Sequence, residues 1–192
     1  MSKDPAYLAL LQDYYADQGV FPPYSAIGQI LGLRSKSSVA AFVGRMRATG
    51  YLEATEDRRL KPGARFFERT RRGTVRAGHP QNAEDSYLDP VSLDRYLVGA
   101  PSRTVLIEVK GDSMSGAGIL PGDLAVVERD GPAGNGDLVV ALVDGEFTLK
   151  HLAQTDGLYV LMPANPDYPV IRPEGTLEIY GIVRGIVRKY SK

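Results

Sequence analysis

A serine in the stretch "KGDSMSGAGILPGD" and a lysine in the stretch "GEFTLKHL" have the types and settings of a catalytic pair. Ser113 follows a strand-like run and a glycine, where a small hydroxyl side chain can serve as a nucleophile. The chain has no cysteine and only two histidines, which excludes thiol catalysis, disulfides and zinc fingers. A serine nucleophile therefore needs a base of another type, and Lys150 is the candidate.

A lysine acts as a general base only when it is uncharged. At its ordinary pKa of about 10.4, roughly one lysine in 2,500 is neutral at pH 7. Burial among apolar side chains lowers that pKa by about 3–5 pH units, into the range useful for proton transfer. A Ser113–Lys150 dyad then needs no third residue. The backbone N–H groups of Ser113 and Met114 are the candidate oxyanion hole.

Histidine is the rival base, in a Ser-His-Asp triad. His151 adjoins Lys150 and should therefore point to the opposite face of the strand. His79 lies in the polar stretch between the two halves of the chain, next to the small pair Ala77-Gly78. Neither has an evident carboxylate partner, so the dyad is favoured, and neither a metal site nor a cofactor is expected.

Length and charge indicate two small domains of different character. A chain of 192 residues suggests two domains. Residues 1–78 carry 13 Lys and Arg against 7 Asp and Glu, whereas residues 79–192 carry 10 against 16. This asymmetry indicates that only the first half meets a polyanion. Neither a membrane-spanning run nor a signal peptide is evident, so a soluble, cytoplasmic protein is expected.

The basic half has the pattern of a winged helix-turn-helix. Apolar residues recur at helical spacing in "YLALLQDYYADQG", "YSAIGQILG" and "SSVAAFVGRM". Ser35 is the expected N-cap of the third helix. The stretch "YLEATEDRRLKPGARFF" reads as a hairpin, which would be the wing. The alternative is a small helical bundle with a hairpin of no particular function.

DNA binding is favoured because no Asp or Glu occurs between residues 18 and 52. The third helix would enter the major groove through its small polar start, and lysines and arginines would contact phosphates. The predicted DNA contacts are Arg34, Ser35, Lys36, Ser37, Ser38, Ala41 and Arg45 near the third helix, and Arg58, Arg59 and Lys61 on the wing.

The acidic half is dense in strand signals from residue 100 onward, so we expect a mainly β domain closed on itself. The predicted fold class is α+β. The predicted domains are a DNA-binding domain over residues 1–68, a linker over 69–85 and a β domain over 86–192. Within the linker, the small pair Ala77-Gly78 would let an active site close on an extended peptide.

The stretches "GDSM…GI…GDLAVV", "GDLVVALVDGEFTLKHL" and "LMPANPDYPVI" resemble the self-cleaving serine peptidase domain of LexA repressors, UmuD and related phage repressors. The resemblance runs from about Val75 to the C-terminus. It implies Ser113 as nucleophile, Lys150 as uncharged base and a scissile bond between Ala77 and Gly78. It also implies a homodimer through the C-terminal domain and activation by RecA filaments on single-stranded DNA.

The N-terminal stretch "PPYSAIGQILGLRS" also resembles LexA, but the helix "SKSSVAAF" lacks the Asn and paired Glu expected there. The DNA-binding role therefore carries over and the operator sequence does not. We expect a dimeric repressor of DNA-damage (SOS) genes that binds operator double-stranded DNA and inactivates itself. The alternatives are a non-cleaving phage-type repressor controlled by a protein antagonist, a protease acting on other proteins, and a UmuD-like accessory of a translesion polymerase.

Overall fold

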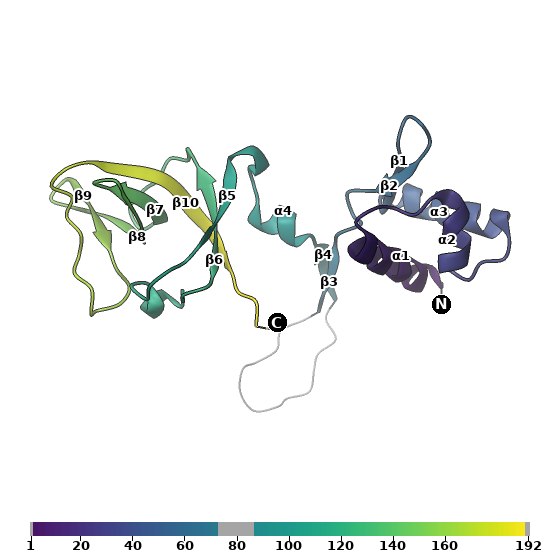
Figure 1. The fold of residues 1–192 in the computed structure, drawn as a ribbon, viewed down its shortest axis with the longest axis horizontal. Coiled ribbons are helices and arrows are strands. Elements are labelled where there is room, and N and C mark those ends of the chain that lie inside the picture. The colour runs from purple at the N-terminus through teal and green to yellow at the C-terminus, as the bar shows by residue number, and fades with distance from the viewer. Residues whose placement is uncertain (1, 73–86, 191–192) are drawn as a thin grey trace, which may run out of the picture. The chain divides into compact units, whose positions relative to one another are not determined.

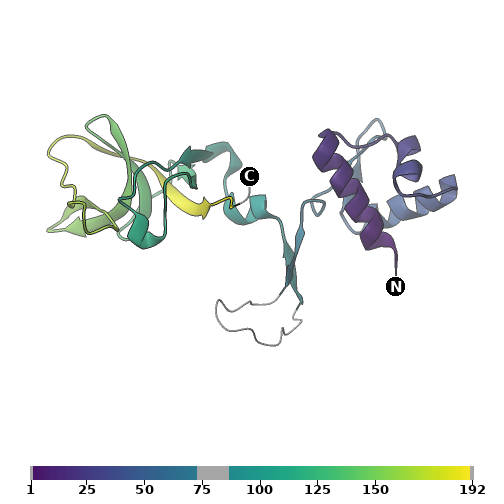
Figure 2. The same ribbon diagram turned by 60° about the horizontal axis from the view of Figure 1, so that its bottom comes forward.

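The computed structural model describes residues 2–72 and 87–190, and the chain divides into two compact units, Met1–Leu93 and Asp94–Lys192 (Figure 1, Figure 2). The first unit contains three helices and short strands, and the second is dominated by strands. The predicted α+β fold class is therefore confirmed. Within the described ranges, no helix combines the length and apolar character needed to cross a membrane.

Local signals set the limits of the three helices of the first unit, which are α1 (Asp4–Gln18), α2 (Tyr24–Ile30) and α3 (Lys36–Ala48). Helix α1 ends where Gly19 adopts a φ of +69° and its N–H donates to the Tyr15 carbonyl. Helix α3 begins at Ser35, whose hydroxyl accepts from the Ser38 N–H at 3.1 Å. The predicted N-cap is therefore confirmed.

The core of the first unit buries the apolar stripe of α3, together with Leu11 of α1 and Ile27 of α2. The stripe consists of Val39, Phe42, Val43 and Met46. Strands β1 (Leu52–Ala54) and β2 (Leu60–Pro62) pair antiparallel. This hairpin is the predicted wing, so the helices and the hairpin form the expected winged helix-turn-helix.

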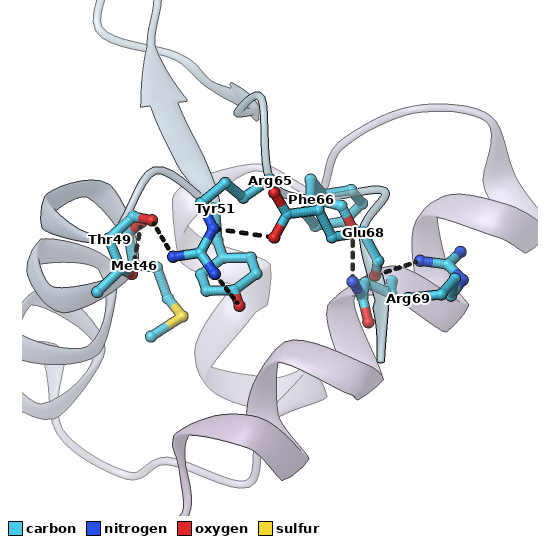
Figure 3. Close-up of polar contacts among 8 residues, drawn as sticks. Met46, Thr49, Tyr51, Arg65, Phe66, Glu68 and Arg69 are labelled. Carbon is cyan, nitrogen blue, oxygen red and sulfur yellow. Dashed lines mark hydrogen bonds and ion pairs between the residues drawn. The ribbon is translucent and has the colours of Figure 1, made fainter. Parts of the chain in front are cut away.

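After the wing, the chain passes close to the end of α3, where the side chain of Arg65 connects the two (Figure 3). The Arg65 guanidinium donates to the Thr49 carbonyl at 3.2 Å and to the Tyr51 hydroxyl at 3.2 Å. It also pairs with Glu68 at 2.9 Å. Because Thr49 caps α3 and Tyr51 precedes β1, these contacts fix the base of the wing against the helix.

A second two-stranded sheet completes the first unit and consists of β3 (Arg69–Arg72) and β4 (Tyr87–Val91), paired antiparallel. The sequence does not indicate a strand at β3, because an arginine-rich stretch lacks the alternation of apolar and polar residues. Its pairing partner lies farther along the chain, and local patterns do not reveal such pairings.

The second unit is built on one six-stranded antiparallel sheet, ordered β5-β6-β10-β7-β8-β9. A short helix, α4 (Leu93–Leu97), precedes it. The strands are β5 (Thr104–Glu108), β6 (Leu124–Arg129), β7 (Leu138–Val143), β8 (Glu146–Thr155), β9 (Leu158–Met162) and β10 (Leu177–Val187).

The expectation that this β domain closes on itself is wrong, because β5 and β9 lie at opposite ends of the strand order and do not pair. Strand β10 instead bends the sheet, with register shifts between Ile179 and Gly181 and between Val183 and Gly185. Such bulges increase local twist and curvature. The bent sheet packs two apolar clusters, of which one contains Met114 and surrounds the candidate catalytic residues.

Candidate active site

Ser113 lies in the turn that follows β5, where the chain bends over a buried methionine. Gly111 adopts a φ of +75°, which permits the sharp change of direction. The next residue after the serine, Met114, is 2% exposed and anchors the turn in the core. The Ser115 N–H donates to the Asp112 carbonyl at 3.0 Å and closes the turn. The serine hydroxyl is therefore held at the edge of the core.

Lys150 lies on β8, and the structure brings it to Ser113. Its Nζ is 2.7 Å from the Ser113 Oγ. The lysine is only 6% exposed and pairs across the sheet with Val139, which is fully buried. This burial lowers the pKa of the Lys150 amine from its ordinary value. The two residues have the contact and the environment that proton transfer requires.

The other two contacts of the Lys150 Nζ orient the amine. Nζ donates to the Thr148 Oγ1 at 3.0 Å and to the Leu149 carbonyl at 3.0 Å. A neutral amine has two N–H bonds and one lone pair. When these acceptors take both N–H bonds, the lone pair faces the third neighbour, the Ser113 hydroxyl. Thr148 lies two residues before Lys150 on β8 and therefore on the same face of the strand.

Replacement of Thr148 by valine is expected to slow self-cleavage about five-fold, because one of the acceptors that orient Nζ is lost, which costs about 1 kcal/mol. A Thr148→Ser variant keeps the hydroxyl and should cut near the wild-type rate. Rates of fragment appearance at one alkaline pH compare the variants. Equal rates for valine and serine would show that Thr148 does not orient the amine.

A groove of about 280 Å³ gives access to Ser113 and Lys150. Its walls are mostly apolar, with Ile107 and Val109 on one side and Phe147 from β8 on the other. Apolar walls of this kind accommodate small or apolar side chains and exclude water from the reacting groups. The predicted scissile residues, Ala77 and Gly78, lie outside the described residues.

The N–H groups of Ser113 and Met114, predicted as the oxyanion hole, donate to no acceptor in the part of the chain that the structure describes. The neighbouring N–H of Ser115 is occupied by Asp112. Unoccupied N–H donors beside a nucleophile can stabilise a developing oxyanion. Among the described residues, His151 forms no hydrogen bond with Ser113, whose hydroxyl contacts Lys150. The other rival base, His79, lies outside the described residues.

A loop after β9 packs against the turn that carries Ser113 and forms hydrogen bonds with its main chain. The Ala164 N–H donates to the Ser113 carbonyl at 2.9 Å. The Asn165 amide donates to the Asp112 carbonyl at 3.2 Å, and the Tyr168 hydroxyl donates to the Asp112 carboxylate. At Gly116 a side chain has no room, because an added Cβ would lie 1.8 Å from the Ala164 carbonyl oxygen. The turn and the loop therefore act as one packed unit.

An ion pair with a buried carboxylate stabilises the segment between Gly118 and Asp123, which follows the turn that carries Ser113. Asp123 is 1% exposed and accepts from the Leu120 N–H at 2.8 Å. It pairs with Arg188, just beyond β10, whose guanidinium also donates to the Gly118 carbonyl at 2.6 Å. These contacts, led by the hydrogen bond from Arg188, lower the pKa of Asp123 to about 2. Sequence analysis missed this pair.

The predicted DNA contacts divide into residues without an ion pair and residues that already form one. The start of α3 and the turn before it are exposed, as a surface for a DNA groove must be. Arg45, in contrast, forms two hydrogen bonds of 2.7 Å with Asp4. On the wing, Arg59 pairs with Asp57 at 2.9 Å and Lys61 with Glu53 at 3.1 Å. Arg34, Ser35, Lys36, Ser37, Ser38, Ala41 and Arg58 form no ion pair among the described residues.

Comparison with known proteins places this chain in a family. The family model described as Peptidase S24-like matches residues 71–184. The chain is 35% identical to a LexA repressor of Pelotomaculum thermopropionicum, over 97% of this chain and 96% of the relative. It is 37% identical to LexA repressor 1 of Geobacter sulfurreducens, over 94% and 93%. These matches span both units, and the chain therefore belongs to the LexA repressor family, with an S24-like peptidase domain in its C-terminal part.

Proposed function

We propose that this LexA-type repressor of the SOS response ends repression by cutting its own chain between Ala77 and Gly78, with Ser113 as nucleophile and Lys150 as base. The observation that carries the proposal is the 2.7 Å contact between the Ser113 Oγ and the Nζ of a lysine that is 6% exposed. Burial lowers the pKa of this lysine, so a neutral amine is available nearer to neutral pH than in an exposed lysine.

The reaction follows from the contacts of the dyad. The neutral Lys150 amine takes the hydroxyl proton while the Ser113 Oγ bonds to the carbonyl carbon of Ala77. The N–H groups of Ser113 and Met114 stabilise the oxyanion. The Lys150 ammonium then gives its proton to the amide nitrogen of Gly78 as that bond breaks. A water molecule, deprotonated by the same amine, hydrolyses the acyl-serine ester and frees Ser113.

Operator double-stranded DNA is the proposed partner of the first unit. The third helix, α3, presents an exposed, small polar start that suits the major groove. The second unit would hold two chains together as a homodimer. Tethering two DNA-binding units raises the apparent affinity by about 10²–10⁴ over one alone. The Ala77-Gly78 bond lies in sequence between β3 and β4 of the first unit. Its cleavage would detach the winged helix-turn-helix from the dimerising unit and remove that gain, which explains why a repressor carries its own peptidase.

The proposed activator is a RecA filament on single-stranded DNA. Cleavage requires the Ala77-Gly78 bond to reach the Ser113 Oγ, and an activator that binds this reactive arrangement better than the others increases its population. The UmuD-like and non-cleaving alternatives are not favoured, because the matched relatives are LexA repressors over nearly their whole length.

Incubation of the purified chain at a series of pH values from 7 to 10, followed by intact mass, tests the reaction. We expect fragments 1–77 and 78–192, produced faster as pH rises because more Lys150 is neutral. A Ser113→Ala chain mixed with the wild type should stay whole, because cleavage is within one molecule.

The proposed activator is tested at neutral pH by adding RecA, nucleotide and single-stranded DNA to the purified chain, with each component left out in turn. Cleavage should require all three. A wild-type chain that stays whole at every pH and with the complete filament would contradict self-cleavage and favour a repressor controlled by a protein antagonist.

A further inference from the structure

The outer face of α3 and the wing enclose a hollow of about 550 Å³ within the first unit. Small residues line part of it, with Ala40 and Gly44 from the helix and Ala54 from the wing. The larger side chains of Tyr24, Val43 and Leu60 line the rest, together with Thr55. A Cβ added at Gly44 would meet nothing within 4 Å. This wing hollow is therefore open at Gly44, where a polymer backbone can approach the main chain of α3 closely.

Two arginines stand at the edges of the wing hollow. Arg47 comes from α3 and Arg58 from the turn of the wing, and both are exposed. Neither forms an ion pair within the ranges that the structure describes. The neighbouring cations Arg45 and Arg59 are engaged by Asp4 and Asp57. The wing hollow therefore carries two cations that are available to an anion, in addition to Arg34 and Lys36 at the start of α3.

The backbone of Arg58 is unusual for this residue type. Arg58 has a φ of +63°, in the left-handed region that favours glycine. The other non-glycine residues with positive φ in the described ranges are all aspartates, which tolerate that region. A glycine would suit the Arg58 position better for folding alone. Strained conformations of this kind cluster at functional sites, and the strain here places a guanidinium at the wing hollow.

The geometry of the wing hollow is preset by the contacts at the base of the wing. The Gly63 N–H donates to the Tyr51 carbonyl at 2.8 Å, and the Arg65 N–H donates to the Gly50 carbonyl at 3.1 Å. The Arg65 guanidinium ties the same strand to the end of α3 (Figure 3). The helix and the hairpin that carry Arg47 and Arg58 therefore cannot separate freely, so little ordering is needed when an anion binds between them.

We propose that the wing hollow binds a backbone phosphate of double-stranded DNA, held between Arg47 of α3 and Arg58 of the wing. The open space at Gly44 admits the sugar-phosphate chain, and the two guanidinium groups supply the charge-assisted hydrogen bonds that phosphates accept. Arg47 is then the phosphate contact of α3, in place of Arg45. This assignment rests on the DNA binding proposed above and goes beyond it by naming the contact.

The test is the salt dependence of binding of the full chain to a fluorescent duplex of random sequence, because phosphate contacts do not depend on base sequence. Each lost contact should reduce the slope of log affinity against log salt by about 0.9 per protomer, and the affinity by roughly eight-fold at 0.1 M salt. We expect this change for Arg47→Ala and Arg58→Gly. Arg47→Lys should keep the slope, and Arg59→Ala is the matched wing control.

Thermal unfolding separates a binding role from a structural one. Because glycine suits a positive φ, Arg58→Gly should leave the unfolding temperature unchanged or raise it while DNA binding weakens. Unchanged salt slopes in both Arg47→Ala and Arg58→Gly would overturn the phosphate site and leave DNA binding in place. A wild-type chain that fails to bind the duplex even at low salt would instead overturn the proposed function.

Discussion

Self-cleavage of a Lys150→Ala variant is expected to be at least about 10²-fold slower than that of the wild type, because a positioned general base contributes about 10²–10⁴ to the rate. Nothing else in the described part of the chain replaces Nζ, which alone lies 2.7 Å from the Ser113 Oγ. The measurement is the rate of fragment appearance by intact mass. Lys150→Arg is the sharper control, since arginine keeps the charge but does not deprotonate. Substantial cleavage by Lys150→Arg would contradict the role as base.

The pH profile of the wild type distinguishes lysine from histidine as the base. Below the pKa of the Lys150 amine, the neutral fraction rises ten-fold per pH unit, so the logarithm of the rate should rise with a slope of one. Burial lowers this pKa, and the plateau should therefore begin below pH 10.5. A plateau that begins near pH 6.5 and persists in a Lys150→Ala variant would instead indicate His79 or His151.

The parts of the molecule that follow local rules can be predicted from its sequence. The apolar stripe of α3 and the Ser35 cap depend on residues within one or two helical turns. The strand alternation around Lys150 likewise places Thr148 on the same face. The pairing of Ser113 with Lys150, 37 residues apart, was predictable because both have the chemistry that a dyad needs and both resemble a family motif.

The parts that sequence analysis missed depend on contacts between distant residues. Arg45 has the charge expected of a DNA contact, but Asp4, 41 residues earlier, forms two hydrogen bonds with one edge of its guanidinium. The partners Asp123 and Arg188 are 65 residues apart and belong to no local pattern. The strand at Arg69–Arg72 exists only because it pairs with β4. In each case the deciding partner is set by the fold, so no window of sequence contains the signal.

The second large effect is expected at the Asp123–Arg188 pair, which ties the serine turn to the end of β10. An Asp123→Asn or Arg188→Met variant leaves its partner with an uncompensated charge, and Asp123 is 1% exposed. Breaking a buried pair from one side is strongly destabilising, and we expect the unfolding temperature to fall by about 5–10 °C. Arg184, which pairs with Glu128 and is 43% exposed, is the control on the same strand, and Arg184→Met should change little.

The Asp123–Arg188 pair is also expected to influence the rate of cleavage, because it forms hydrogen bonds with the main chain that follows Ser113. Asp123 accepts from the Leu120 N–H, and Arg188 donates to the Gly118 carbonyl, within the turn that begins at Ser113. Small displacements of reacting groups cost up to about 10² in rate. Asp123→Asn should therefore cut more slowly than the wild type at temperatures where both are folded. A wild-type rate in a folded Asp123→Asn chain would show that the pair stabilises the domain without positioning Ser113.

Acid should abolish the stability difference between the wild type and Asp123→Asn. The pKa of Asp123 is lowered to about 2 in the folded chain, from 3.8. A lowered carboxyl pKa stabilises the fold fully above the unfolded value, and the stabilisation is lost as pH falls through the folded value. The difference in unfolding temperature should therefore stay constant at pH 5 and above and shrink between about pH 4 and 2. A difference that already declines above pH 5 would mean that a group other than Asp123 is responsible.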